Sequence, residues 1–478
     1  MSPAATQESE VIFQTAEGVK LRGALSRITR HAAVFELYNP SITLRISEAL
    51  NEFKITFQKR AIYCGRAVVH NILDTGSKVV CEAKLDESLW TGLESDWLTN
   101  RPGQIAEQFK VFIRDWQKFS KVSPEFKIVI ADMLGFLHDL RLWLDRVELE
   151  IRTLSEPMRA QREKQVVDNL AAPIIEVIDS FINRFESIVT GLNSEAHPNH
   201  YTHLRRQLHP LVLVSPFAHR AFHKPLGYAG DYLMVDMMIR SPYEGDTLFA
   251  KIINLWLLGQ SPAQAHRNRV VHLERKLIEE TMRVKTAGRV AKIFNLGCGP
   301  AAEVQNFLEQ YPIAKHASLT LVDFNQETLQ HLQNKLNAIS RRVPETASFR
   351  LVNKSVYQIL KDSGRSLPHS SNEKYDYIYC AGLFDYLSDT VCKQLMNIFY
   401  EMLAPGGLLL ATNATDVLND IKPFRYSMEY ILDWYLNYRD KNRFATLAPD
   451  LAAPDDIKVI AENTGANLFL EVKKPENV

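Results

Sequence analysis

The chain has 478 residues, which is long for one hydrophobic core and predicts two or three domains. Hydrophobic residues make up 46% and charged residues 23%, the composition of an ordinary soluble globular protein. Lys and Arg total 56 and so do Asp and Glu, and this balance argues against nucleic acid or an anionic membrane as the main partner.

The five cysteines are odd in number and scattered, with no C-x-x-C pair. Neither a disulfide framework nor a zinc site is expected, and we predict no bound metal. The first residues lack the basic-then-apolar pattern of a signal peptide, and no run of 18 or more apolar residues occurs. These features predict a cytoplasmic protein without an integral membrane segment.

Short strand-like stretches dominate the first ninety residues. They cover residues 34–38, 42–46, 53–57, 66–70 and 79–83. Turn residues such as Asn39 and Pro40 separate them. Five or six strands at this spacing predict a small β-barrel over residues 1–100.

From about residue 103 the apolar residues recur at helical intervals among charges. The clearest stripe, spaced alternately by four and three residues, is Ile174, Ile178, Phe181, Phe185, Ile188 and Leu192. Such a stripe is typical of a buried core or of a seam between two helices. Residues 101–205 are therefore predicted to be a helical linker or dimerisation segment, and a homodimer is a candidate state.

The next segment, residues 206–284, begins with a polar and aromatic cluster from His219 to Tyr232. An apolar helix-like stretch to Leu258 and a charged amphipathic helix from about Pro262 to Arg283 follow. We expect this segment to form a helical cap on the substrate side. Strands then alternate with helices over residues 285–478, which predicts a mostly parallel α/β sheet.

A glycine turn follows the first strand of that unit, in Asn295-Leu-Gly-Cys-Gly-Pro-Ala-Ala302. Gly297 and Gly299 permit a tight turn and close approach of a ligand, and the next helix offers free amide donors. The spacing also satisfies G-x-G-x-x-A, so the turn alone leaves a dinucleotide, and hence an NAD-dependent dehydrogenase, as a competitor.

Later strand ends favour a different cofactor. Asp323 ends the second strand, where it can accept hydrogen bonds from both hydroxyls of a ribose. Ser355 and Val356 follow the third strand and suit the edge and face of an adenine ring. The fourth strand runs into a loop at the same edge, and a helix, the turn Pro405-Gly-Gly407 and a fifth strand come after it.

This ordered set resembles the class I S-adenosylmethionine-dependent methyltransferases, over residues 285–478. The resemblance implies a Rossmann-like domain that binds S-adenosyl-L-methionine, with Gly297 and Gly299 at the methionine moiety, Asp323 at the ribose, and Ser355 and Val356 at the adenine. The family usually has an acid where Asn295 stands. The full set of predicted cofactor residues is Asn295, Gly297, Gly299, Asp323, Phe324, Ser355, Val356, Ala381 and Arg269.

A narrower resemblance rests on four segments within about residues 200–440. The chain resembles a bacterial family of extracellular-factor 3-hydroxypalmitic acid methyl ester biosynthesis proteins in residues 224–232, 267–269, 382–386 and 424–434. That resemblance implies O-methylation of a 3-hydroxy fatty acid carboxylate to a methyl ester used as a quorum-sensing signal. The expected partner is then a small acyl or carboxylate substrate.

Acceptor chemistry decides which groups the site needs. A carboxylate is already an anion, so it requires hydrogen-bond donors and an apolar wall, whereas an amine or hydroxyl requires a general base. The predicted catalytic residues are Tyr228, Asp231, Tyr232, Asp385 and Tyr386. His223 or Arg425 could add a positive group, and further candidates for the acceptor site are Phe384, Met428, Tyr430 and Trp434. Asp231 or Asp385 could act as that base, so an amine or hydroxyl acceptor remains an alternative.

The segment Asn71-Ile-Leu-Asp-Thr-Gly76 resembles the Asn/Asp-x-Ser-x-x-Gly signature of PilZ domains, which bind cyclic di-GMP. Leu73 replaces the serine, and Arg27 and Arg30 stand one residue closer than in the usual pair. We therefore expect a degenerate PilZ-like barrel that does not bind cyclic di-GMP. A non-catalytic signalling protein that responds to S-adenosylmethionine or a cyclic nucleotide is the rival to an enzyme.

Overall fold

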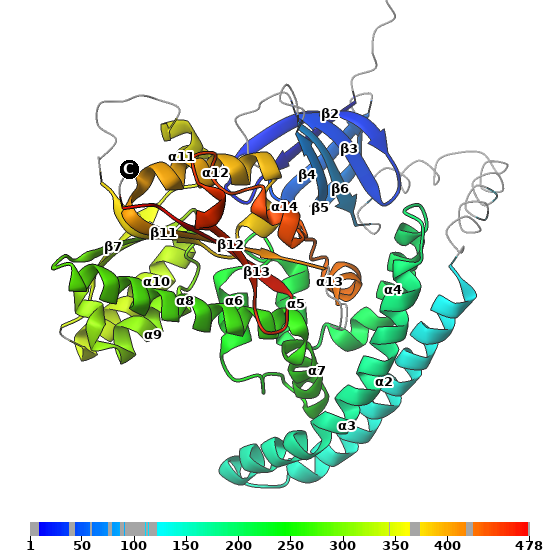
Figure 1. Cartoon of the computed structure of the whole chain (residues 1–478). Coiled ribbons are helices and arrows are strands. Elements are labelled where there is room, and N and C mark those ends of the chain that lie inside the picture. Colours follow the sequence, from blue (N-terminus) through cyan, green and yellow to red (C-terminus); the bar gives the residue numbers. More distant parts are fainter. Residues whose placement is uncertain are drawn as a thin grey trace, which may run out of the picture.

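A computed structural model describes most of the chain, and it confirms the multidomain architecture. Figure 1 shows a β-barrel, a helical region with a long protruding hairpin, and an α/β unit. The described residues are 9–37, 44–57, 60–74, 79–86, 90, 110, 113, 122–343, 345–363, 373–416 and 424–476. No helix in these ranges is both long enough and apolar enough to cross a membrane.

The N-terminal barrel is closed and antiparallel, with strand order β1-β2-β3-β6-β5-β4. Its strands are Ser9–Gln14 (β1), Lys20–Ile28 (β2), Ala32–Leu37 (β3), Ala49–Phe57 (β4), Arg60–Asp74 (β5) and Val79–Leu85 (β6). Buried aromatic rings fill it, with Phe13, Phe35 and Phe53 within 6 Å of one another between centroids (5.3, 5.7 and 5.7 Å). Alternation of buried and half-buried residues along β3 and β6 gives the barrel its inner face.

Strands β1 and β2 were not predicted, and the segment before β4 was predicted to be a strand. Of the strand predicted at residues 42–46, the first two residues lie outside the described ranges, and residues 44–46 form a turn rather than a strand. Ser47 follows with a positive φ of 63°, a backbone conformation that breaks strand pairing. Leu44 and Ile46 of this turn are buried, so apolar residues here do not mark a strand of the sheet.

Two long antiparallel helices, Pro124–Ile151 (α2) and Glu156–Thr190 (α3), form the hairpin in Figure 1, and His197–Val212 (α4) packs beside them. Most of the helical pattern predicted between residues 103 and 121 lies outside the described ranges. In the predicted stripe, Ile178 and Phe185 are fully buried in the core of the same chain. The stripe is therefore occupied by intramolecular packing, and a homodimer stays a prediction.

Four further helices lead into the sheet: Pro216–His223 (α5), Tyr232–Ile239 (α6), Leu248–Gly259 (α7) and Ser261–Thr286 (α8). The predicted boundary between residues 284 and 285 falls within the last turn of α8. The helical core also takes in Arg425–Leu432 (α13) from the C-terminal part of the chain. Domain limits drawn along the sequence therefore do not separate the helical cap from the α/β unit.

The α/β unit holds a seven-stranded sheet in the order β12-β13-β11-β10-β7-β8-β9. Its strands are Ala291–Leu296 (β7), Ala317–Asp323 (β8), Ser348–Asn353 (β9), Tyr375–Cys380 (β10), Leu403–Ala414 (β11), Ile457–Ala461 (β12) and Asn467–Lys473 (β13). Strands β7 to β11 are parallel, whereas β13 is antiparallel to both neighbours. The carboxyl ends of the parallel strands therefore share one edge, where ligands bind in such sheets.

Helices cover both faces of the sheet (Figure 1). The helices are Ala302–Gln310 (α9) and Gln326–Arg342 (α10), which share one hydrophobic cluster with α8, and Asp389–Met402 (α12) and Val356–Ser363 (α11), which pack on the other. Side chains of β7 alternate between the two clusters, with Ile293 in one and Phe294 in the other. Both faces are thus closed, and the carboxyl edge is left for the site.

Candidate active site

The glycine turn after β7 has the strained backbone that its sequence predicts. Gly297 and Gly299 have positive φ angles of 70° and 52°. The Gly297 amide donates to Val322 O over 2.8 Å, which ties the turn to β8. A Cβ at position 299 would meet nothing within 4 Å, so this stretch of backbone faces open space rather than packed side chains.

Asp323 joins this turn to the end of β8. Its carboxylate is buried and accepts hydrogen bonds from the Gly299 amide over 3.1 Å and from the Asn325 amide over 2.9 Å. Burial raises the pKa of Asp323 above its usual value. Two backbone donors thus fix the carboxylate at the carboxyl edge of the sheet, beside the glycine turn.

A cavity opens at this edge between the sheet, the helical cap and the barrel. The predicted cofactor residues that line it are Asn295, Gly297, Gly299, Asp323, Phe324, Val356, Ala381 and Arg269. Ser355 is not among the described residues that line it. Its hydroxyl accepts from the Gln358 amide over 3.3 Å and the Gln358 side chain accepts from the Ser355 amide over 2.8 Å, so this serine caps α11.

A second cavity, of about 250 Å³, adjoins the first. Residues that line both are Gly230, Val235, His266, Arg269, Gly382 and Tyr386. Its walls are mixed: Met238, Pro262, Ala265, Phe424, Met428, Trp434 and Leu436 are apolar or aromatic, and polar residues such as Ser261, Asp385, Thr415, Asp416, Tyr438 and Asn467 line it too. Arg425 also lines it, paired with Asp416 over 2.6 Å, whereas Phe384 and Tyr430 are buried in hydrophobic cores.

The structure places the five predicted catalytic residues in different surroundings. Tyr228, Tyr232 and Tyr386 line the first cavity, and Asp385 lines the second. Asp231 is not one of the described residues that line either cavity. Its carboxylate caps α6 through the Met234 amide (3.0 Å) and pairs with Arg220 over 2.8 Å, so the structure gives it a structural role.

Tyr386 and His266 line both cavities. The Tyr386 hydroxyl accepts from Trp434 Nε1 over 2.9 Å, and burial raises its pKa, so the phenol keeps its proton. His266 Nδ1 lies 2.6 Å from Arg269 Nη2, and burial lowers the pKa of His266 well below its usual value. Because Arg269 can only donate, the neutral imidazole carries its proton on Nε2, a buried atom without a hydrogen-bond partner in the described structure.

Glu303 supplies an acid next to the position where Asn295 replaces one. Both side chains are buried and line the first cavity, with Asn295 Nδ2 3.5 Å from Glu303 Oε1. The Tyr379 hydroxyl donates to the same carboxylate oxygen over 2.8 Å. Asn295 Oδ1 is a buried acceptor without a hydrogen-bond partner among the described residues. The unusual amide at position 295 is thus accompanied by a carboxylate in the first turn of α9.

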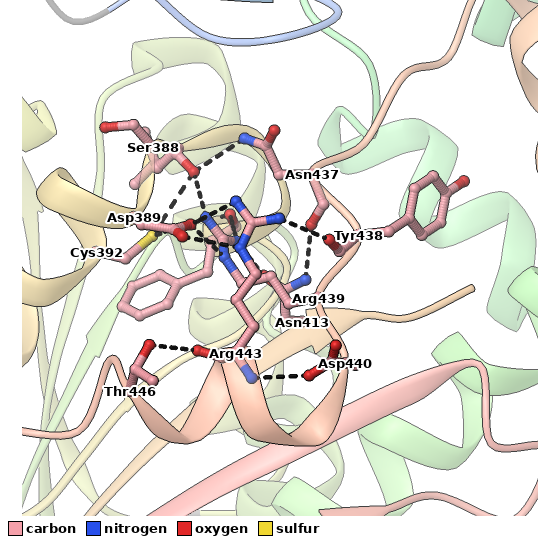
Figure 2. A network of polar contacts seen from close by, with 12 residues as sticks. Ser388, Asp389, Cys392, Asn413, Asn437, Tyr438, Arg439, Asp440, Arg443 and Thr446 are labelled. Carbon is pink, nitrogen blue, oxygen red and sulfur yellow. Dashed lines mark hydrogen bonds and ion pairs between the residues drawn. The ribbon is translucent and has the colours of Figure 1, made fainter. Parts of the chain in front are cut away.

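Arg439 holds the loop that carries Asp385 and Tyr386. Figure 2 shows its buried guanidinium at the centre of a polar network. It donates to Phe384 O over 2.8 Å, to Leu387 O over 2.7 Å and to the Asp389 carboxylate over 2.8 Å. Two of these acceptors are backbone carbonyls on either side of the loop, so Arg439 fixes its shape without touching the cavities.

The donors and acceptors of the first cavity are complementary to S-adenosylmethionine. Arg269 offers hydrogen to a carboxylate, while Asn295 Oδ1 and Glu303 offer acceptors to an ammonium group. Asp323 can accept from ribose hydroxyls. Since Asn295 Oδ1 and His266 Nε2 are buried polar atoms without a partner within the described chain, the cavity suits a polar ligand rather than an apolar one.

Residues 294–409 match the family model of a methyltransferase domain. An uncharacterized protein of Rickettsia prowazekii is 28% identical over 118 residues, which cover 25% of this chain and 40% of that protein. The chain thus spans less than half the length of this curated relative.

Two solved structures with bound S-adenosylhomocysteine are also similar. The magnesium protoporphyrin IX methyltransferase of Synechocystis is 11% identical with a TM-score of 0.30, over 44% of this chain and 84% of that one. The N-methyltransferase NodS of Bradyrhizobium japonicum is 16% identical with a TM-score of 0.29, over 51% of this chain and 98% of that one. The match over residues 294–409 coincides with the glycine turn, Asp323 and the parallel strands. The match identifies a methyltransferase domain in the C-terminal unit.

Proposed function

We propose that this protein methylates the carboxylate of an acyl substrate, with a 3-hydroxy fatty acid as the acceptor and its methyl ester as the product. The observation that carries the proposal is the second cavity, which shares His266, Arg269 and Tyr386 with the cofactor cavity and is lined in part by the apolar and aromatic side chains of Met238, Phe424, Met428, Trp434 and Leu436. A fatty acid has the same division between a charged head and an apolar chain. Methylation removes that charge, which suits a product released as a signal.

For the cofactor, the proposal assigns one group of residues to each part of the molecule. Gly297, Asn295, Glu303 and Arg269 hold the methionine moiety, and Asp323 with Val356 holds the adenosine. When bound, S-adenosylmethionine supplies an electrophilic methyl group on its sulfonium. The chain's own residues then act by positioning the acceptor and excluding water.

For the acceptor, the proposal needs donors and no base. Tyr386 keeps its proton because its pKa is raised, and the neutral His266 offers Nε2–H at the same junction. Both can orient a carboxylate toward the methyl group without taking a proton from it. Met428 and Trp434 are then among the apolar and aromatic side chains of the second cavity, where an acyl chain would run.

Asp385 favours a second candidate, an amine or hydroxyl acceptor that must lose a proton. It lines the second cavity, and burial raises its pKa above the usual value. Its Oδ1 already accepts from the Ala414 amide over 2.6 Å, which holds the carboxylate in the loop. The two candidates differ in whether Asp385 takes part in transfer.

The test is turnover of the full-length protein with S-adenosylmethionine. The acceptors are straight-chain 3-hydroxy fatty acids, unsubstituted fatty acids, and matched amines and alcohols, with methylated product and S-adenosylhomocysteine quantified by mass spectrometry. We expect the acids to be converted to methyl esters. The turnover number should change little in Asp385→Asn and Asp231→Asn, and it should be lower in Tyr386→Phe. Two results would contradict a carboxylate as the methyl acceptor. One is methylation of amines or alcohols alone, and the other is loss of activity in a folded Asp385→Asn variant that still binds S-adenosylhomocysteine. Cofactor binding without turnover of any acceptor would favour a sensor.

A further inference from the structure

Arg45 reaches the cofactor cavity from the N-terminal barrel, a part of the chain outside the methyltransferase domain. It lies in the turn before β4 and lines the cavity together with Tyr228, Asp323 and Phe324. Only 7% of its side chain is exposed. The cavity of the α/β unit is therefore closed on this side by a residue of another domain.

The backbone around Arg45 is fastened to both domains. On one side the Ile46 amide donates to Tyr386 O over 3.3 Å, and the Ala49 amide donates to Gly227 O over 2.6 Å. On the other side the Ser47 amide donates to Val69 O in β5 over 2.8 Å. Glu48 accepts from the Arg45 amide over 2.9 Å and caps the turn internally. The position of Arg45 is thus set by the contact between barrel and α/β unit.

The side chain of Arg45 is oriented but not saturated. Nη2 donates to Glu17 Oε1 over 2.8 Å, and the guanidinium carbon lies 4.1 Å from the centroid of the Phe324 ring. Nε is buried and has no hydrogen-bond partner in the described structure. An unsatisfied buried donor of this kind is rare unless a ligand or water completes it. Arg45 therefore lines the cavity with Asp323 and carries a buried N–H that has no partner in the described structure.

We propose that Arg45 binds the adenosine half of S-adenosylmethionine, so that the N-terminal barrel completes the cofactor site. The inference rests on the proposed function of this cavity. Arg45 lies against Phe324, which follows Asp323 at the end of β8. The groups assigned to the methionine half lie elsewhere, with Asn295 on β7 and Arg269 on α8. A planar guanidinium can stack on an aromatic ring and donate to a base or ribose at the same time.

This assignment couples the barrel to the cofactor. A ligand that contacts both domains binds only their docked arrangement, so it stabilises that arrangement by its differential affinity. The barrel then acts on the enzyme through cofactor affinity.

The test is calorimetric titration of S-adenosylhomocysteine into the full-length protein and its variants. Arg45→Lys keeps the charge facing Glu17 but removes Nε–H and the planar stack, and we expect a Kd raised at least about fivefold. Arg45→Ala removes the donor altogether, and we expect about tenfold or more. Arg22→Lys makes the same change on the exposed face of β2 and should leave the Kd unchanged.

5′-Methylthioadenosine, which lacks the amino acid part, identifies the half of the cofactor concerned. The ratio of Kd between Arg45→Lys and wild type should be the same for this ligand as for S-adenosylhomocysteine. Wild-type affinity in a folded Arg45→Lys overturns the inference, whether or not Arg45→Ala folds, and so does an effect that disappears with methylthioadenosine. Failure of the wild-type protein to bind S-adenosylhomocysteine is a different result, because it overturns the proposed function itself.

Discussion

The guanidinium of Arg269 lies directly against the α-carbon of Gly382. A Cβ at position 382 would stand 3.0 Å from Nη2 and 3.1 Å from Nη1 of Arg269. Gly382 has a φ of +78°, and its amide donates to Thr412 Oγ1 over 3.0 Å. Both the close approach and the backbone conformation require glycine, and together they fix Arg269 where the two cavities meet.

Gly382→Ala is expected to weaken S-adenosylhomocysteine binding about tenfold, because the methyl group displaces Arg269 and the backbone is strained by roughly 1–3 kcal/mol. Gly288→Ala is the matched control. It has a φ of +72° with nothing within 4 Å of its Cβ position, so it should lower stability without changing the Kd. Equal affinities of the two variants in calorimetry would show that Arg269 is not held by this contact.

Glu303→Gln tests how the methionine amino group is held. The neutral amide removes the charge that faces an ammonium group, and a charge-assisted hydrogen bond contributes roughly 1.5–3 kcal/mol. S-adenosylhomocysteine should therefore bind about tenfold or more weakly, while 5′-methylthioadenosine should bind as it does to the wild type. A parallel loss for both ligands would place Glu303 away from the amino group.

Asn295→Asp restores the acid that the family usually has, yet it should not improve the site. The new carboxylate would lie beside Glu303, whose Oε1 is 3.5 Å from the Asn295 side chain, and two buried carboxylates at that distance repel. We expect a lower thermal unfolding midpoint and weaker binding, both measured at neutral pH. The double variant Asn295→Asp with Glu303→Gln should recover most of the stability, and no recovery would contradict this repulsion.

Arg439→Met should be strongly destabilising, by roughly 3–5 kcal/mol, because it leaves Phe384 O, Leu387 O and the Asp389 carboxylate without their buried donor. Arg443→Met is the control, since Arg443 pairs with the same Asp389 from an exposed position and should cost about 1 kcal/mol or less. Urea unfolding followed by circular dichroism measures both. Similar losses in the two variants would mean that the network in Figure 2 does not hold the loop.

Glu186 links α3 to α13, the helix that carries Met428, and it makes the stability depend on pH. Its Oε1 accepts from the Ser427 amide and hydroxyl, each over 2.7 Å. Burial raises the pKa of Glu186 from 4.5 to about 7. The folded state therefore binds this proton more tightly than the unfolded state, and the resulting stability is fully present below about pH 4.5 and lost as the pH rises through about 7.

Glu186→Gln removes that proton while keeping an oxygen acceptor. Between about pH 5 and pH 8 the wild type should lose up to about 3 kcal/mol of stability relative to this variant, at about 1.4 kcal/mol per pKa unit. Urea unfolding of both proteins at the two pH values gives the difference in unfolding free energy between them. The contributions of other titrating groups cancel in that difference. A difference that does not change with pH would contradict the raised pKa.

The strands of the α/β unit and the residues at their ends could be predicted from the sequence. Gly297, Asp323 and Val356 follow from local pattern, because parallel strands of one sheet must bring their carboxyl ends together. Asp231 and Ser355 cap helices, and an Asp or Ser before a helix is as well suited to capping it as to binding a ligand, so their roles in the site stay predictions.

His266, Glu303, Arg439 and Arg45 were not predicted. Each enters the site region from a helix or from a segment distant in sequence, so no local period marks it. His266 precedes Arg269 by three residues on α8, and that helical spacing was the one signal available. The position of Arg45 in the cavity depends on how the barrel docks onto the α/β unit, which is a tertiary contact.

The most direct test is titration of S-adenosylhomocysteine into the full-length wild-type protein and a folded Asp323→Ala variant. We predict one binding site per chain in the wild type and a loss of about tenfold or more in affinity when the carboxylate that faces the ribose is removed. A folded wild-type protein that does not bind, or an Asp323→Ala variant that binds as tightly as the wild type, would contradict the assignment of this cavity as the cofactor site.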